Sequence, residues 1–142
     1  MHFGSPDSMV KLLRDRGFIT IFMLTQEKRY QKMDEFAENQ GFDILVSKED
    51  FAAAGLDAKY MQEWGVFDRF LYTEALERLE AHRDDKVFMT ILGCDTHTAS
   101  GRLEYHDVPY PALPAFIENA EPPELRRWLQ SIFYHDLSLI HI

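Results

Sequence analysis

The most suggestive site in the sequence directly follows the apolar run at residues 87–92, where the chain reads Gly93-Cys94-Asp95-Thr96-His97. An unbroken apolar run of this length is typical of a buried strand. In open α/β sheets, ligands bind beyond the carboxyl ends of the strands. Gly93 permits a sharp exit from the strand, which would bring the polar residues to that edge. Because a histidine there can donate a hydrogen bond to an anionic oxygen, we take His97 as a candidate substrate-binding residue.

Other interpretations of this segment stay open. His97 can also be a loop histidine held by a nearby carbonyl. A metal site of Cys94, Asp95 and His97 is disfavoured, because structural zinc sites usually have four ligands in spaced pairs and the sequence has no second Cys pair and no HxxxH motif. Nothing in the sequence indicates that the single cysteine is activated, so a buried, inert thiol is favoured over a nucleophile. We therefore expect no catalytic residue, no metal ligand and no cofactor in this chain.

Two further candidates, Tyr30 and Lys32, follow an earlier apolar run at residues 18–24. The carboxyl ends of parallel strands meet at one edge, so both side chains could line the same cleft as His97. The alternative is that they are the first residues of a helix, with Tyr30 in the core and Lys32 facing solvent. Asp43 and Asp68 look like a turn residue and a helix N-cap, and we assign them no chemistry.

Strands and helices that would position these residues alternate along the chain. Apolar runs predict strands at residues 18–23, 42–46 and 87–92, the last as a central strand. Helical spacing predicts apolar faces at Met9-Leu12-Leu13, Tyr30-Met33-Phe36-Ala37, Leu71-Ala75-Leu76-Leu79 and Leu125-Trp128-Leu129-Ile132-Phe133. The weak pattern at 47–63 predicts a loop with helical turns, and 93–124 a long irregular segment. This alternation predicts an α/β fold with a mainly parallel sheet and helices on both faces.

Length and composition restrict the class of protein. The 142 residues suffice for one domain, and 46% hydrophobic residues can form a core. A net charge of −9 without any Lys/Arg cluster argues against a nucleic-acid partner. No apolar run reaches the roughly 18 residues of a transmembrane helix, and the N-terminus has no signal-peptide pattern. We expect no membrane segment in this chain.

Several motifs in order resemble the sulfatase family. They are Gly41-Phe42-Asp43, then Trp64-Gly65-Val66-Phe67-Asp68 with its helix, then the apolar strand and His97. The resemblance extends over about residues 8–137 and is nearest to the branch of lipoteichoic acid synthases and phosphoglycerol transferases. It implies a partial alkaline-phosphatase-like three-layer sandwich, on the extracytoplasmic face of a bacterial membrane.

The resemblance also implies a function for the parent enzyme, a metal-dependent sulfatase-like hydrolase or phosphoglycerol transferase acting on sulfate or phosphate esters. A Thr, Ser or modified Cys attacks the ester, and a divalent metal (Mn, Ca, Mg or Zn) is bound. His97 falls where the family holds the anionic group of the substrate. Tyr30 and Lys32 stand where the branch has a substrate-contacting Trp and Arg, and Asp95-Thr96 replaces the usual Ser-Asn.

In the family the nucleophile lies upstream of this region, and an Asp-His metal pair lies downstream of the last helix. We therefore expect residues 1–142 to be an internal fragment of a sulfatase-type catalytic domain, inactive alone, whose partners are the missing flanking parts of its own domain. Residues 1–7 and 137–142 are expected outside the ordered fold, and the last six read as a truncation more than as a natural C-terminus. The rival hypothesis is a small stand-alone, non-catalytic α/β binding module that uses residues 93–124 for recognition.

Overall fold

The computed structural model describes residues 8–61, 64–96 and 112–140, with side chains as far as residue 133. Its strands are β1 (Phe18–Leu24), β2 (Ile44–Val46) and β3 (Lys86–Leu92). Its α-helices are α1 (Met9–Asp15), α2 (Met33–Gln40), α3 (Lys48–Ala53), α4 (Asp68–Ala81), α5 (Ala115–Glu118) and α6 (Pro123–Ile140), and short 3₁₀ helices form η1 (Tyr30–Lys32) and η2 (Ala58–Tyr60). The alternation of helices and strands confirms the predicted α/β class.

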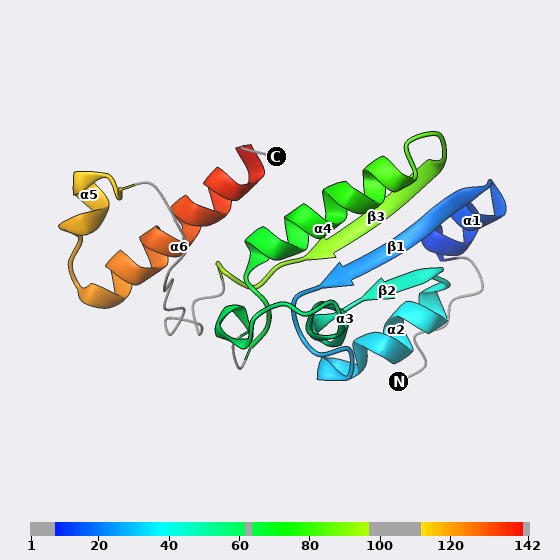
Figure 1. Cartoon of the computed structure of the whole chain (residues 1–142), viewed down its shortest axis with the longest axis horizontal. Helices are drawn as coiled ribbons and strands as arrows, with labels where there is room; N and C mark the ends of the chain where they lie inside the picture. The colour runs from blue at the N-terminus through cyan, green and yellow to red at the C-terminus, as the bar shows by residue number, and fades with distance from the viewer. Residues whose placement is uncertain (1–7, 62–63, 97–111, 141–142) are drawn as a thin grey trace.

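The three strands form a parallel sheet in the order β2-β1-β3 (Figure 1). Ile21 of β1 is in register with Ile44 of β2 and Met89 of β3. The prediction that residues 87–92 form a central strand is therefore wrong for the described residues, since β1 occupies the centre. An apolar run reports burial of both faces of a strand, but it carries no information about which strands pair along its two edges.

Side chains of β1 alternate between two apolar clusters, one on each face of the sheet. Ile21 and Met23 pack in the cluster that includes Phe51 of α3 and Leu71 of α4. The neighbouring positions, among them Phe22, pack instead against α2. Helices thus cover both faces of the sheet, as predicted.

In α4 and α6, the buried residues differ from the apolar faces that the sequence predicts. In α4, Leu71 and Ala75 are buried, whereas Leu76 and Leu79 are each 41% exposed. The sheet covers a narrower strip of this helix than the sequence pattern suggests, and α6 packs against α4 beside it (Figure 1). In α6, three residues of the predicted stripe are partly exposed, at 36% to 40%, while Leu129 and Phe133 are half-buried: the exposed ones are Leu125, Trp128 and Ile132.

In α1 the buried residue is Val10, while Met9 and Leu12 of the predicted stripe are exposed.

Among the described residues, no helix has the length and apolarity needed to cross a membrane. Residues 137–140 belong to α6, while residues 1–7 and 141–142 lie outside the described part of the chain.

Tyr30 does not share a helix face with the apolar residues of α2, contrary to the sequence prediction. It begins η1, which is separated from α2 by backbone in the left-handed region, with φ of 48° at Gln31 and 62° at Lys32. Two consecutive left-handed residues change the direction of the chain. Met33 and Phe36 still pack on the sheet, but Tyr30 is redirected toward the carboxyl edge.

A candidate ligand pocket at the carboxyl edge of the sheet

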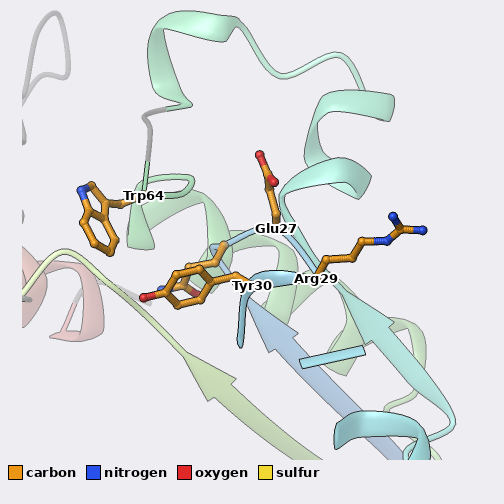
Figure 2. A pocket seen from close by; sticks show the side chains of 5 residues that line it. Glu27, Arg29, Tyr30 and Trp64 are labelled. Atoms are coloured by element: carbon orange, nitrogen blue, oxygen red, sulfur yellow. The ribbon is translucent and has the colours of Figure 1, made fainter. Parts of the chain in front are cut away.

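A hollow lies beyond the carboxyl end of β1, where open α/β sheets bind ligands. It has a volume of about 360 Å³ and is lined by Gln26, Glu27, Arg29, Tyr30 and Trp64 (Figure 2). A smaller hollow of about 180 Å³ shares three of these residues and extends to Gly93 and Cys94 at the end of β3. The exits of two neighbouring strands therefore contribute to the same region.

Two aromatic side chains face each other across this pocket. The rings of Tyr30 and Trp64 lie 6.2 Å apart between centroids and are inclined by 76°, in an edge-to-face arrangement. Figure 2 shows Tyr30 directed toward Trp64, while Glu27 and Arg29 extend away from the aromatic pair. Both rings are partly exposed, at 40% and 37%. Such walls offer apolar contact to the uncharged part of a ligand.

Trp64 lines the pocket, although the sequence indicated it only as part of a family motif. Its place depends on Gly65, because a Cβ atom there would lie 2.7 Å from the carbonyl oxygen of Thr25. That carbonyl accepts a hydrogen bond from the backbone N–H of Val66 at 2.9 Å. The glycine thus lets the Trp64 segment lie directly on the end of β1. An aromatic residue beside a glycine that permits such an approach is the signal that could have identified it.

Lys32 lies apart from the residues that line the pocket. Its Nζ atom is 3.2 Å from Oε2 of Glu35, and its side chain is 68% exposed. The structure therefore places Tyr30, but not Lys32, in the wall of the hollow, and the cation among the lining residues is Arg29. His97 lies outside the described residues.

Asp68 bonds to the exit of β3, which corrects its interpretation as a helix N-cap. The N-cap of α4 is Phe67, and Asp68 is the first helical residue with a fully buried side chain. Its Oδ1 accepts a hydrogen bond from the N–H of Cys94 at 2.7 Å, and its Oδ2 accepts one from the N–H of Asp95 at 3.3 Å. Because α4 begins beside the end of β3, the carboxylate bonds to the strand exit.

Asp95 returns a hydrogen bond to the start of α4. Its Oδ2 accepts from the backbone N–H of Asp68 at 3.1 Å, while its Oδ1 is buried and has no hydrogen-bond partner in the described chain. The side chain is only 2% exposed. Burial, and then the nearby charge of Asp68, raise the pKa of Asp95 to about 8. Gly93 makes the close approach possible, because a Cβ atom there would collide with the Asp68 carboxylate.

Cys94 is buried, as one of its two interpretations expected, and its thiol donates a 3.9 Å hydrogen bond to the carbonyl of Val66. Burial raises the pKa of Cys94 to about 12, and the charges of Asp68 and Asp95 act in the same direction. The thiol is therefore protonated at neutral pH, in the form that is a poor nucleophile.

Solved structures with the same arrangement of elements define the fold. The lipoteichoic acid synthase LtaP from Listeria monocytogenes superposes with a TM-score of 0.70 at 21% identity, over 92% of this chain and 30% of that one. A protein in the alkaline phosphatase superfamily from Vibrio parahaemolyticus superposes with a TM-score of 0.57 at 21% identity, over 89% of this chain and 30% of that one. The fold is thus alkaline-phosphatase-like.

The sulfatase family model matches residues 3–136, so the chain belongs to the sulfatase family. Phosphoglycerol transferase I of Salmonella arizonae is 27% identical over 92 residues, which are 63% of this chain and 12% of that protein. The same protein of Salmonella newport matches to the same extent. The chain therefore spans about an eighth of the curated relatives it matches, and the expected relationship to the phosphoglycerol transferase branch is confirmed.

A divalent metal, which the family implies for the parent enzyme, does not fit the acidic cluster of the described residues. Asp68, Cys94 and Asp95 offer ligand atoms within 4.8 Å of one another. However, burial raises the pKa of Asp95 to about 8 and that of Cys94 to about 12, so both groups are protonated at neutral pH. Metal ligands must be deprotonated. We therefore assign no metal to this cluster.

Proposed function

We propose that this chain forms one wall of the substrate pocket in a larger sulfatase-type catalytic domain that cleaves or transfers sulfate or phosphate esters. One observation carries the proposal: in a chain of this family, a hollow with aromatic walls lies at the carboxyl edge of β1 and β3. This edge is where α/β enzymes bind their ligands. Similarity to phosphoglycerol transferase I and to LtaP favours a phosphate ester with a glycerol-type carrier.

Tyr30 and His97 have complementary parts in this proposal. The Tyr30 ring contacts the carrier of the ester, and Trp64 closes the same apolar wall. His97 donates a hydrogen bond to the anionic group, as its place after β3 in the sequence suggests. The edge-to-face contact between Tyr30 and Trp64 supports the first role, and only sequence position supports the second.

Lys32 is proposed as a second contact to the anion. Its present partner is Glu35, and the two side chains are exposed to 68% and 57%. Ion pairs this exposed contribute little to stability. Lys32 can therefore exchange Glu35 for a bound anion at small cost. Arg29, which lines the hollow already, is the competing cation, and comparing the two variants decides between them.

The nucleophile and the ligands of a divalent metal are proposed to come from parts of the catalytic domain outside this chain. The chain alone then binds anionic esters without cleaving them. A metal in the assembled domain would polarise the ester and stabilise the charge that develops on its oxygens. The proposed location of that domain is the extracytoplasmic face of a bacterial membrane.

Binding of glycerol phosphate and of inorganic sulfate to the 142-residue chain tests the proposal. In a Trp128→Phe background, Trp64 is the single tryptophan and reports on the pocket by its emission. We expect saturable binding that weakens by about tenfold in Tyr30→Ala, which corresponds to about 1.4 kcal/mol of lost contact. Lys32→Ala should weaken binding more than Arg29→Ala, and Lys59→Ala serves as the matched cation control outside the pocket.

Two outcomes would contradict the proposal. The first is the absence of any saturable change in Trp64 emission with either anion. The second is Mn²⁺-dependent cleavage of an aryl phosphate or aryl sulfate by the purified chain, because this requires a nucleophile and a metal site that the proposal assigns elsewhere.

A further inference from the structure

The start of α4 and the exit of β3 are held together by two buried carboxyl groups that bond to each other's backbone. Asp68 accepts from the N–H of Cys94 and of Asp95, and Asp95 accepts from the N–H of Asp68. These three bonds are the described polar links between the two segments. Gly93 and Cys94, which lie inside this arrangement, also line the smaller hollow beside Tyr30 and Trp64. The carboxyl pair thus positions one wall of the pocket.

Two ionised carboxylates cannot share this space without a large free-energy cost. Both side chains are at least 98% buried, with exposures of 0% and 2%. Repulsion between like charges is strong where water is excluded, and carboxyl pairs in such places bind one proton between them. Asp95 Oδ1 is the oxygen on which a proton fits, because it is buried and has no hydrogen-bond partner among the described residues.

Three other titratable or charged groups of the described chain interact with the pair or its neighbour Cys94. Tyr72 of α4 faces both carboxyl groups, and burial followed by their charges raises the pKa of Tyr72 to about 12. The neighbouring thiol of Cys94 is protonated as well. Lys48, at the start of α3, is the nearby cation, and its charge acts on Cys94. Tyr72 and Cys94 therefore carry no charge at neutral pH.

We propose that Asp68 and Asp95 share a single proton, and that this proton holds the exit of β3 against α4 and so keeps the pocket wall in place. Both oxygens of Asp68 accept backbone N–H bonds, whereas one oxygen of Asp95 has no hydrogen-bond partner among the described residues. Asp95 is the protonated member. Loss of the shared proton in mildly alkaline solution places a second charge in the buried pair, loosens residues 93–95 and changes the environment of Trp64. Both residues act as positioning residues, and neither is proposed to touch the ester.

The sign of the stability effect follows from linkage. Because the folded-state pKa of Asp95 is raised to about 8, the pair binds its proton more tightly than the unfolded chain does. Its contribution to stability is therefore fully present below about pH 4, the ordinary range of an aspartate, and is lost as the pH rises toward about pH 8. Above that pH the contribution is constant.

The variant Asp95→Asn tests the inference because an amide imitates the protonated acid. Its oxygen can accept from the N–H of Asp68, and its NH₂ group takes the place of the protonated oxygen. In the Trp128→Phe background, we expect Trp64 emission to change with a midpoint near pH 8 over a titration from about pH 6 to about pH 10, and we expect Asp95→Asn to abolish this transition. Asp84→Asn, which changes a side chain that is 95% exposed, is the matched control and should keep the transition.

A second measurement keeps the test independent of how the variant folds. The ¹³C carboxyl resonances of the unmodified chain should include one aspartate that titrates near pH 8. If every aspartate titrates below about pH 5, the inference is wrong. It is also wrong if Asp95→Asn is folded and keeps the emission transition, or if Mn²⁺ shifts the transition in the unmodified chain but not in Asp95→Asn, since the pair would then bind a cation. These readouts need no ester, so their failure is separate from failure of the proposed function.

Discussion

At each end of the sheet, an aspartate accepts hydrogen bonds from backbone N–H groups, but the charges and the solvent exposure around the two aspartates differ. At the amino end, the Asp43 carboxylate accepts from the N–H of Thr20 at 3.0 Å and from its hydroxyl at 2.8 Å, and Arg14 Nε lies 3.7 Å from the other oxygen. At the carboxyl end, Asp68 also accepts from backbone N–H groups, but it is fully buried and lies beside the buried Asp95.

This difference separates a structural end from a candidate functional end. The Asp43 side chain is 36% exposed and that of Arg14 is 50% exposed, so solvent and a counter-charge stabilise the carboxylate at little cost. The buried carboxyl pair is tolerated only with a proton and with three backbone hydrogen bonds. Groups whose protonation is perturbed in this way gather at functional sites. The pocket lies beside that pair, at the carboxyl end.

The largest expected difference between the two ends is in thiol reactivity. Cys94 has a pKa raised to about 12 by burial, so its thiolate fraction near pH 8 is on the order of 1,000-fold below that of an ordinary cysteine. We expect iodoacetamide to alkylate Cys94 slower by that factor than a cysteine at the amino end, introduced as Arg16→Cys in a Cys94→Ser background. Mass spectrometry measures both rates. Equal rates in the folded proteins would show that the carboxyl end is open to solvent.

Removing the charge from Asp68 should cost more stability than the same change at Asp43. Asp68→Asn puts an NH₂ group against one of two buried N–H donors, which we expect to destabilise the fold by about 3 kcal/mol. Asp43→Asn, in its exposed setting, should cost about 1 kcal/mol. Urea unfolding near neutral pH measures both. Similar losses for the two variants would contradict the distinction between the ends.

Replacing a glycine by alanine should destabilise the fold more at the carboxyl end than at the amino end, and for a different reason. Gly65→Ala brings a Cβ to 2.7 Å from the Thr25 carbonyl oxygen and should cost about 2 to 3 kcal/mol through overpacking. Gly17, at the amino end, has φ of 80° and nothing near its added Cβ, so Gly17→Ala should cost only the left-handed backbone strain of about 1 kcal/mol. Thermal melting of both variants tests this order. Gly65→Ala should also move the emission of Trp64, and Gly17→Ala should not.

The smallest expected effect is the loss of the ion pair at the amino end. Arg14→Ala removes an exposed partner of Asp43 and should cost about 0.5 kcal/mol, and less at high salt, where exposed charges are screened. Arg14 Nη1 also donates to the Gly41 carbonyl at 3.1 Å. Arg14→Lys keeps the charge but removes this guanidinium donor, so it distinguishes the contribution of the ion pair from that of the hydrogen bond. Urea midpoints with and without added NaCl measure the effect. A loss as large as that of Asp68→Asn would remove the contrast between the two ends.

The sequence was a good guide to the elements and a partial guide to the site. Periodicity predicted the strands and their helices because one side of each element must be buried, and the edge at which Tyr30 lies followed from strand direction. Periodicity could not predict the left-handed residues Gln31 and Lys32, which separate Tyr30 from α2. Nor could it show that Lys32 pairs with Glu35 outside the pocket, since rotamer and backbone direction decide this together.

By itself, the sequence determined the α/β class, the parallel strands, the family motifs and the segment after β3 as the region of interest. These properties depend on local patterns of apolar residues, glycines and caps, which neighbouring residues largely fix. Only the tertiary structure decided that β1 is the central strand, that Trp64 faces Tyr30, and that Asp68 and Asp95 bury their carboxyl groups against each other. Those relations join residues far apart in the sequence: Tyr30 and Trp64 are 34 positions apart, and the paired residues Ile21 and Met89 are 68 apart. The free energy of a buried charge also depends on every group that the fold brings beside it.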